Sequence, residues 1–337
     1  GVLNYLGVTS KYQAPSGARS ETDYEVVPVP QFYGTYTPKE SAFSYGLGVY
    51  SPFGLGLKWP ETSGFRTAAI EARLQYACLN PVIAWRAAPN LSIAAGPTIN
   101  YSKLKFRSGV LSPAPGADEF KYTGDNTSFG WTLGLLWKPA DEWSVGLKYR
   151  SPSTTSYDGN VRIYAGGVPV LSRPSTLNVR FPQNVAMGIA YQPNSKWVFE
   201  VNADWTDWDA VNRLVYEGTE GIESAGPISR GLDWRSSWFL EAGVTRRFGN
   251  GMFVSAGYFF SANSTSTHAF NPLVPDTDLH TASVGIGHRG QRLSWALASQ
   301  WITGPKRSIS GSEWGASVDG KYQFVIPTIV ASAGWKF

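Results

Sequence analysis

The sequence has few charged residues, a single cysteine and no long hydrophobic run. Asp, Glu, Lys and Arg make up 16% of the 337 residues, against about 25% in an average soluble domain. The lone Cys78 cannot form an internal disulfide and leaves no cysteine metal cluster. No stretch of eighteen apolar residues occurs, which excludes a membrane-spanning helix. A disulfide scaffold and a helical membrane protein are therefore both excluded.

Residues suited to catalysis or metal binding are equally scarce. The three histidines are His268, His280 and His288, and no spacing brings one to a serine and an orienting group, or to further metal ligands. Lysine and arginine are scattered, and the formal net charge is only +4, so a nucleic-acid footprint is not expected. We predict no enzyme, no metal and no cofactor.

Aromatic residues and glycine are abundant instead. Aromatics reach 14%, with 14 Trp, and 36 residues are Gly. In the last segment, 320–337, apolar side chains alternate with small or polar ones, and one face carries Ile329, Ala331, Ala333, Trp335 and Phe337. Such alternation is typical of a strand with different solvents on its two faces. By itself this segment also fits an edge strand of a soluble β-sandwich, whereas the composition favours a transmembrane β-barrel.

The spacing of turns decides between these two folds. Fourteen strands are expected, at about 2–13, 24–37, 42–50, 66–86, 91–107, 126–138, 143–157, 176–192, 197–216, 232–248, 252–264, 277–288, 293–304 and 320–337. Six tight turns alternate strictly with seven longer loops, which is typical of an up-and-down membrane barrel. We predict an all-β, 14-stranded antiparallel transmembrane β-barrel, with residues 1–337 as one domain. Both termini then fall on the short-turn, periplasmic side.

Alternation also predicts which side chains face lipid. In the strands from 143 and 197, the outward residues are Trp143, Val145, Leu147, Tyr149, Trp197, Phe199, Val201, Ala203 and Trp205. Their inward neighbours include Lys148, Arg150, Glu200 and Asp204. In the strand from 66, we expect Ile70, Leu74, Tyr76 and Cys78 outside and Glu71, Arg73 and Gln75 inside, because a lipid-facing charge is costly. Trp85, Trp137 and Trp143 beside tight turns fit an aromatic girdle.

Several short motifs resemble one family of outer-membrane barrels. They are Ser51-Pro-Phe-Gly54, Asn80-Pro-Val-Ile-Ala-Trp85, Tyr149-Arg-Ser151, Phe181-Pro-Gln-Asn-Val-Ala-Met-Gly-Ile-Ala-Tyr191, Ala203-Asp-Trp-Thr-Asp-Trp208 and Val274-Pro-Asp-Thr-Asp278. The order and spacing of these motifs over residues 24–337 resemble those of the long-chain fatty-acid transporters of the FadL type and of the related aromatic-hydrocarbon channels. The resemblance implies passive uptake of a hydrophobic molecule across the outer membrane of a Gram-negative bacterium.

The resemblance also implies sideways release into the membrane at a kink in the third strand. The residues predicted for this lateral opening are Ser51, Pro52, Phe53, Gly54 and Gly56. Proline removes a ladder hydrogen bond and glycine permits a bulge, although the same residues also suit the mere start of a loop. Three features depart from the family. Its N-terminal plug is not visible in residues 1–337, and the loop 108–125 is too short for the family's helical hairpin. Leu279 occupies a position where the family usually has Arg.

Candidate ligand-binding residues are of two kinds. The cations that could bind the acid group of a ligand are Arg73, Lys148, Arg150 and Arg180. Alternatively, these cations pair inside the barrel with the carboxylates of Glu71, Glu200, Asp204 and Glu241. Apolar candidates are Phe53 and Leu55, with Phe239, Phe253 and Phe259 as further lining or simple filling.

The predicted partners are a hydrophobic small molecule, such as a fatty acid or hydrocarbon, and outer-membrane lipid, with the protein a monomer. A general aqueous porin and a structural or adhesive barrel are the alternative functions.

Overall fold

The computed structural model describes residues 1–223 and 225–337, and it is built almost entirely of β-strands. Twenty-one strand segments form a single sheet: β1 (Val2–Gln13), β2 (Arg19–Glu21), β3 (Glu25–Tyr36), β4 (Phe43–Tyr50), β5 (Leu55–Lys58), β6 (Glu71–Ala88), β7 (Leu91–Ser108), β8 (Asp118–Ala140), β9 (Trp143–Arg150), β10 (Ser153–Ala165), β11 (Val168–Phe181), β12 (Asn184–Tyr191), β13 (Trp197–Thr206), β14 (Arg213–Glu217), β15 (Ile228–Gly231), β16 (Ser237–Arg247), β17 (Met252–Ser261), β18 (Leu279–Arg289), β19 (Leu293–Thr303), β20 (Arg307–Ile309) and β21 (Gly320–Trp335). Two short 3-10 helices are η1 (Trp208–Ala210) and η2 (Ala316–Val318).

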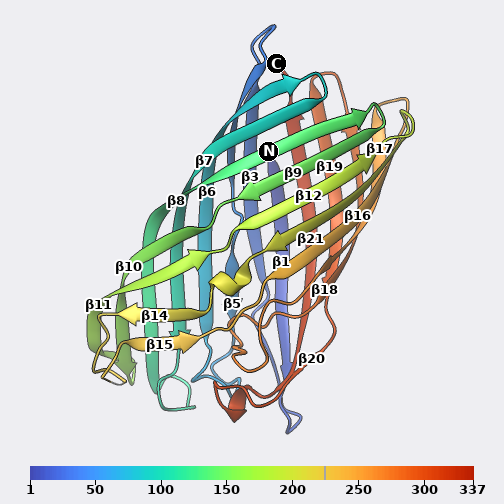
Figure 1. The fold of residues 1–337 in the computed structure, drawn as a ribbon. Coiled ribbons are helices and arrows are strands. Elements are labelled where there is room, and N and C mark those ends of the chain that lie inside the picture. Colours follow the sequence, from blue (N-terminus) through green and yellow to red (C-terminus); the bar gives the residue numbers. More distant parts are fainter. Residues whose placement is uncertain (224) are drawn as a thin grey trace.

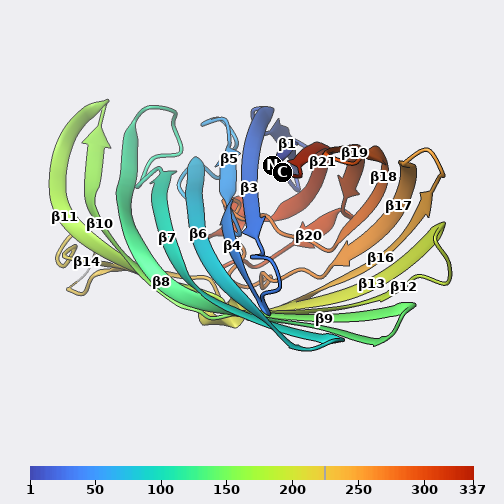
Figure 2. The same ribbon diagram turned by 90° about the horizontal axis from the view of Figure 1, so that it is seen from above.

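Fourteen of these strands pair side by side into a closed ring (Figures 1 and 2). Every pairing is antiparallel, in the order β1, β3, β4, β6, β7, β8, β9, β12, β13, β16, β17, β18, β19 and β21, and β21 returns to β1. The last strand therefore closes the barrel on the first, with Asn4 opposite Val330. The predicted 14-stranded barrel is confirmed.

The connections alternate in length, as expected. Residues between β6 and β7, β8 and β9, β12 and β13, β16 and β17, and β18 and β19 form tight turns, and so does the slightly longer β3–β4 connection. The seven other connections carry the loops and the extra segments β2, β5, β10, β11, β14, β15 and β20. Both chain ends lie toward the short-turn end, because Lys336 N–H donates to the Arg292 carbonyl and Ala333 N–H to the Gly1 carbonyl.

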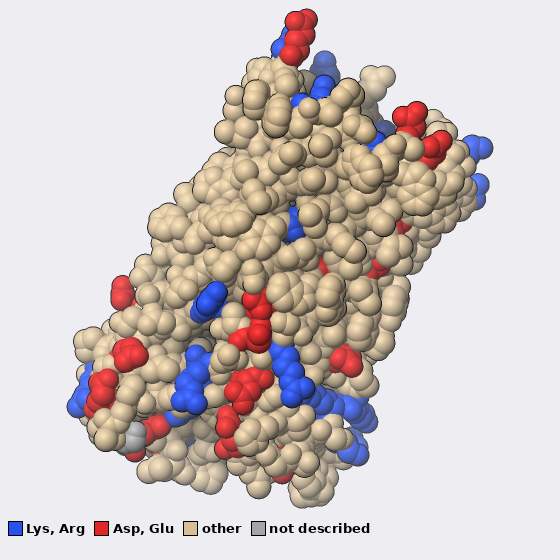
Figure 3. All heavy atoms as spheres, in the orientation of Figure 1, with Lys and Arg blue, Asp and Glu red and all other residues tan. Residues whose placement is uncertain are grey.

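The outer surface of the barrel carries a broad apolar band. Phe129, Val201, Trp238 and Ile286 are among its exposed large side chains. Figure 3 shows most charged side chains of one face near the loop end or at the turn tips, with few between. Exposed Trp85, Trp137 and Trp143 stand beside tight turns, as expected of a girdle. Among the described residues, no helix is long and apolar enough to cross a membrane.

Two predicted strands are interrupted. The segment predicted at 143–157 is β9 and β10, broken at Ser151–Pro152, and that at 176–192 is β11 and β12, broken at Pro182–Gln183. The loop expected between them is instead an extension of the hairpin, because β10 and β11 pair up to a turn at Gly166 and Gly167. Sequence alone underestimated how far these strands reach beyond the apolar band.

The facing predicted for the strand from 66 is wrong. Leu74, Tyr76 and Cys78 of β6 point into the barrel, where Tyr76 and Cys78 are fully buried or nearly so. Glu71, Arg73 and Gln75 consequently lie on the opposite, outer face. These residues sit at the loop end of β6, past the apolar band, where ion pairs bury Glu71 and leave Arg73 partly exposed. The predicted facing of β9 and β13 holds, since Leu147 and Val201 are exposed while Arg150 is buried.

The barrel interior is filled at the loop end by two hydrophobic clusters. One contains Tyr76, Tyr157, Leu177, Phe181 and Tyr216, among others, and packs against Phe53. The other joins the inner faces of β1 and β21 to the loop after β5, through Tyr12, Tyr322, Trp59, Phe65 and Phe270. Tyr12 and Phe65 meet edge to face at 4.8 Å, and Phe270 lies 4.6 Å from Tyr322. These clusters hold the loops inside the mouth of the barrel.

Candidate functional site

The third barrel strand is interrupted between β4 and β5. β4 pairs with both of its neighbours, β3 and β6. After the break at 51–54, β5 still pairs with β6 through Leu55–Leu74 and Lys58–Glu71, but it no longer pairs with β3. Proline deletes a ladder donor and glycine tolerates unusual backbone paths, so Pro52 and Gly54 account for the interruption. The third barrel strand is thus interrupted at the residues that the sequence suggested, and their role in lateral release stays a prediction.

One edge of β3 is left free by this break. Ladder pairing between β3 and β4 stops at Phe32–Val49. From Glu25 to Gln31, β3 is paired with β1 on one side, and within the described residues no strand pairs with its other side. This stretch contains Pro28 and Pro30. Proline is confined to edge positions of sheets because it cannot donate to a neighbouring strand.

The path of β5 runs inside the line of the wall. A Cβ at Gly56 would lie 3.9 Å from Oε2 of Glu25 and 3.9 Å from Cγ2 of Val27. The inner side chains of β3 therefore meet the outer face of β5. The gap is bounded at its loop end by Asp23, whose N–H donates to the Lys58 carbonyl at 3.3 Å. At its other end it is bounded by the β3–β4 ladder, so it is a window between β3 and β5.

A large apolar cavity lies directly behind this window. Its volume is about 560 Å³. Residues 53–57 of the break contribute to its wall, together with aromatic and aliphatic side chains from around the barrel, namely Leu74, Leu104, Phe106, Phe120, Phe181, Trp208, Trp234, Phe239, Phe259, Leu279, Ile302, Phe324 and Ile326. The inner face of β5 touches the cavity through Leu55 and Leu57. Such enclosed, mostly apolar cavities are typical of small-molecule sites.

Comparison with known proteins identifies the family. A family profile described as outer membrane protein transport protein (OMPP1/FadL/TodX) matches residues 4–328. The chain belongs to this family. Members are outer-membrane channels for hydrophobic compounds and not enzymes, which confirms the resemblance seen in the sequence.

Individual relatives of the family are distant in sequence. A long-chain fatty acid transport protein of Escherichia coli O6:H1 is 20% identical over 317 residues, covering 83% of this chain and 70% of that protein. The crystal structure of a Pseudomonas aeruginosa FadL homologue superposes with a TM-score of 0.87 at 18% identity, covering 100% of this chain and 89% of that one. The Pseudomonas putida toluene transporter TodX gives 0.73 at 16% identity, with 100% and 88% covered. At these identities the structures establish the shared fold.

In this FadL/TodX family member, Phe53 lies at the centre of a cluster of aromatic residues beside the break. Its ring centroid lies 5.0 Å from that of Phe181, 5.3 Å from Tyr76 and 5.8 Å from Trp208. Trp208 belongs to η1 and in turn meets Trp234 at 5.3 Å. The cluster fills the interior between the break and η1. Aromatic pairs at these separations add stability beyond their buried area, so Phe53 fixes the start of β5 in place.

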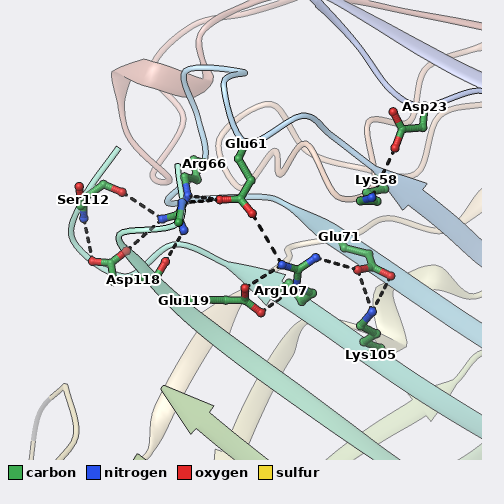
Figure 4. Close-up of polar contacts among 11 residues, drawn as sticks. Asp23, Lys58, Glu61, Arg66, Glu71, Lys105, Arg107, Ser112, Asp118 and Glu119 are labelled. Atoms are coloured by element: carbon green, nitrogen blue, oxygen red, sulfur yellow. Dashed lines mark hydrogen bonds and ion pairs between the residues drawn. The ribbon is translucent and has the colours of Figure 1, made fainter. Parts of the chain in front are cut away.

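A polar network holds the loop that follows β5 (Figure 4). The fully buried Arg66 bonds Glu61 at 2.9 Å and Asp118 at 3.0 Å. Asp118 also accepts the backbone N–H groups of Val110, Leu111 and Ser112. Burial alone would raise the pKa of Asp118, but these donors outweigh it and lower the pKa to about 2. The network therefore ties the loop 59–70 to the β7–β8 connection and fixes the far end of β5.

The predicted apolar residues and the predicted cations have different fates. Phe53 and Leu55 line the cavity, as do Phe239 and Phe259; their role in ligand binding stays a prediction. Phe253 is not part of the cavity wall, because it lies near the short-turn end beneath Arg289.

None of the four predicted cations lines the cavity. Arg73 lies on the outer face and bonds Glu25 at 2.7 Å. Arg150 is buried, donates to the Tyr50 hydroxyl at 2.9 Å and lies over its ring. Arg180 is exposed. Lys148 lines a separate recess of the lumen.

Part of the predicted luminal network lines that recess, which Glu200 does not reach. Lys148, Asn202, Asp204 and Glu241 line it, and Asn202 donates to Glu241 at 3.3 Å. Lys148 thus lies beside acidic residues of the predicted network, and its role in ligand binding stays a prediction. Glu71, expected in the same network, instead bonds Lys105 at 2.8 Å and Arg107 at 3.2 Å at the loop end of β6 and β7.

Sequence reasoning missed the β3 side of the window. The signal was present in Glu25-Val-Val-Pro-Val-Pro-Gln31, because two prolines two residues apart mark a strand edge that lacks a partner. Glu25 and Val27 from this stretch face Gly56. The contribution of η1 through Trp208 was also missed, since a single helical turn gives no periodic pattern.

Proposed function

We propose that this family member takes up hydrophobic molecules into the cavity and releases them sideways through the window between β3 and β5. The observation that carries the proposal is the position of β5: its inner face lines the apolar cavity and its outer face borders a stretch of β3 that has no paired strand. A molecule leaving by this route stays in apolar surroundings. It avoids the polar recess around Lys148 and Asp204 on the way to the turn end.

The orientation that serves this function places the barrel in the outer membrane of a Gram-negative bacterium. The apolar band would lie in the lipid, the long loops outside the cell, and the short turns and both termini on the periplasmic side. Outer-membrane lipid is then the acceptor for the released molecule. The ring closes through β1 and β21 of one chain, so a monomer suffices.

The ligands proposed from the relatives are long-chain fatty acids and monoaromatic hydrocarbons. The E. coli relative is named a long-chain fatty acid transport protein, and TodX is named a toluene transporter. The cavity of about 560 Å³ suits both kinds of molecule, because its lining is mostly apolar.

Transfer into reconstituted liposomes tests the proposal. The purified chain should accelerate the partition of a labelled fatty acid or of a labelled monoaromatic into the bilayer, relative to empty liposomes. Single-channel conductance is recorded on the same preparation, because a general porin would give a large, steady current. Transfer with little conductance supports the proposal, whereas a large conductance without accelerated transfer contradicts it.

A further inference from the structure

The charged side chains in the cavity wall point to the charge of the ligand. Among the described residues that line the cavity, three carry a formal charge: Arg107, Arg230 and Asp276. An ionised acid inside such an apolar cavity needs a cation that is free to receive it, because a carboxylate is very costly to remove from water unpaired. The partners of these two arginines therefore decide which ligands can be held.

Arg107 is already fully engaged by carboxylates. Its Nε and Nη2 each donate to one oxygen of Glu119 at 2.7 Å, and Nη1 donates to Glu71 at 3.2 Å. Its ladder partner Glu71 lies on the outer face, whereas the neighbouring Phe106 lines the cavity, so the Arg107 side chain points away from the cavity. Hydrogen bonds to the two glutamates raise the pKa of Arg107 against the effect of its burial.

Arg230 is engaged in the same way. Nη1 and Nη2 donate to the two oxygens of Glu223 at 2.9 and 2.6 Å, and Nη1 also donates to the Ser229 carbonyl. The third charged group, Asp276, accepts the N–H and hydroxyl of Ser264 and the N–H of Thr277. An anion entering the cavity would meet one neutralised cation, Arg230, and one acidic side chain, Asp276.

We infer, resting on the channel function proposed above, that the cavity takes uncharged hydrophobic molecules, such as hydrocarbons and neutral esters, and discriminates against ionised acids. The discrimination comes from Glu223, which occupies Arg230, and from the outward direction of the Arg107 side chain. A fatty acid enters in its protonated form only. The cations that the sequence suggested for an acid group all lie away from the cavity wall.

A matched pair of ligands tests this inference. Dodecanoic acid and its methyl ester have the same chain, and each is made to compete with a neutral fluorescent probe, N-phenylnaphthylamine, for the chain in detergent. At about pH 8 the acid is ionised, and the ester should bind at least about tenfold more tightly. Ionised acid that binds as tightly as the ester overturns the inference.

Two variants make the test independent of the ligands' own partitioning. Both Glu223→Gln and Glu119→Gln keep the size of the side chain, but only Glu223→Gln releases an arginine at the cavity, Arg230. Glu223→Gln should raise the affinity for the ionised acid about tenfold or more and leave the affinity for the ester unchanged, whereas Glu119→Gln should change neither. Glu142→Gln, in an exposed turn at the other end of the barrel, is the matched control and should change neither.

The outcomes separate this inference from the channel function. Glu223 is partly exposed in a loop, so its variant is expected to fold even if Glu119→Gln does not. Transfer of both acid and ester at equal rates, unaffected by Glu223→Gln, keeps the channel and overturns the preference for uncharged ligands. Failure to bind or transfer either compound rejects the channel itself, and the inference with it.

Discussion

Arg73 Nη2 donates to Glu25 Oε1 at 2.7 Å, and this ion pair joins two strands that have no ladder between them. Arg73 extends from β6 on the register line of Gly56, and Glu25 begins the free edge of β3. The absence of a side chain at Gly56 lets the two charged groups meet. The window between β3 and β5 is therefore crossed near its loop end by this ion pair, next to the contacts of Asp23 with Lys58.

Neutralising this ion pair should open the window with little effect on stability. Arg73 and Glu25 are 39% and 36% exposed, and exposed pairs contribute only about 0–1 kcal/mol. Arg73→Gln should therefore leave the urea midpoint nearly unchanged while speeding ligand transfer into liposomes. The exchanged pair Arg73→Glu with Glu25→Arg should return the rate toward that of the parent. A slower rate in Arg73→Gln would show that the pair guides the ligand rather than restrains it.

A side chain at Gly56 should close the window. The nearest atoms, on Glu25 and Val27, leave room for a Cβ at 3.9 Å, so Gly56→Ala should be tolerated and Gly56→Leu should fill the space between β3 and β5. If Gly56→Leu raises the barrier to transfer through the window by about 1.4 kcal/mol, transfer slows about tenfold. Gly34→Leu on β3, where nothing lies within 4 Å, is the control. Equal transfer by Gly56→Leu and Gly34→Leu would exclude this exit.

Removing the ring of Phe53 should loosen the start of β5. Phe53 contacts Phe181, Tyr76 and Trp208 but is only partly buried, so Phe53→Ala should cost roughly 2–3 kcal/mol, below the ~3–5 kcal/mol of a fully buried Phe. Urea unfolding in detergent measures this loss. Phe53→Leu, which retains most of the apolar volume, should lose less than half as much. A larger loss in Phe53→Leu would contradict the packing role.

Arg150 should prove structural and not ligand-binding. Its side chain is buried, and its Nη2 donates to the Tyr50 hydroxyl at 2.9 Å. Tyr50→Phe leaves that N–H without its acceptor and should destabilise the barrel by roughly 1–3 kcal/mol, with ligand affinity unchanged. Tyr45→Phe, on an exposed position of the same strand, should have no effect. Lost affinity at full stability would instead support the role that the sequence suggested.

Asp118 should make the β7–β8 connection sensitive to acid. Its folded pKa of about 2 lies below the ordinary value of 3.8, so its stabilising effect is complete above about pH 4 and is lost as the pH falls toward 2. Asp118→Asn should bring that loss to neutral pH. Since a hydrogen bond to a charged group contributes about 1.5–3 kcal/mol, amide exchange at Val110, Leu111 and Ser112 should accelerate about tenfold or more. Exchange rates at pH 7 that match the parent would contradict this.

The sequence by itself determined the number of strands, their alternating turns and loops, and the break at Ser51–Gly54. These features are local: period-two alternation, tight turns and the proline-glycine pair act within a few residues. The outward facing of Leu147 and Val201 could also be predicted, because these side chains lie in the apolar band, where a charge facing lipid is costly.

Only the tertiary structure decided what the break does. Arg73 and Glu25 are 48 residues apart, and no spacing in the sequence pairs them. The facing of β6 was mispredicted because polarity reverses at the loop end: the interior around Leu74 and Tyr76 is apolar, while Glu71 and Arg73 form ion pairs outside. Arg230 at the cavity wall likewise acquired its partner, Glu223, from a loop. Long-range packing thus fixed both the window and the charge of the cavity behind it.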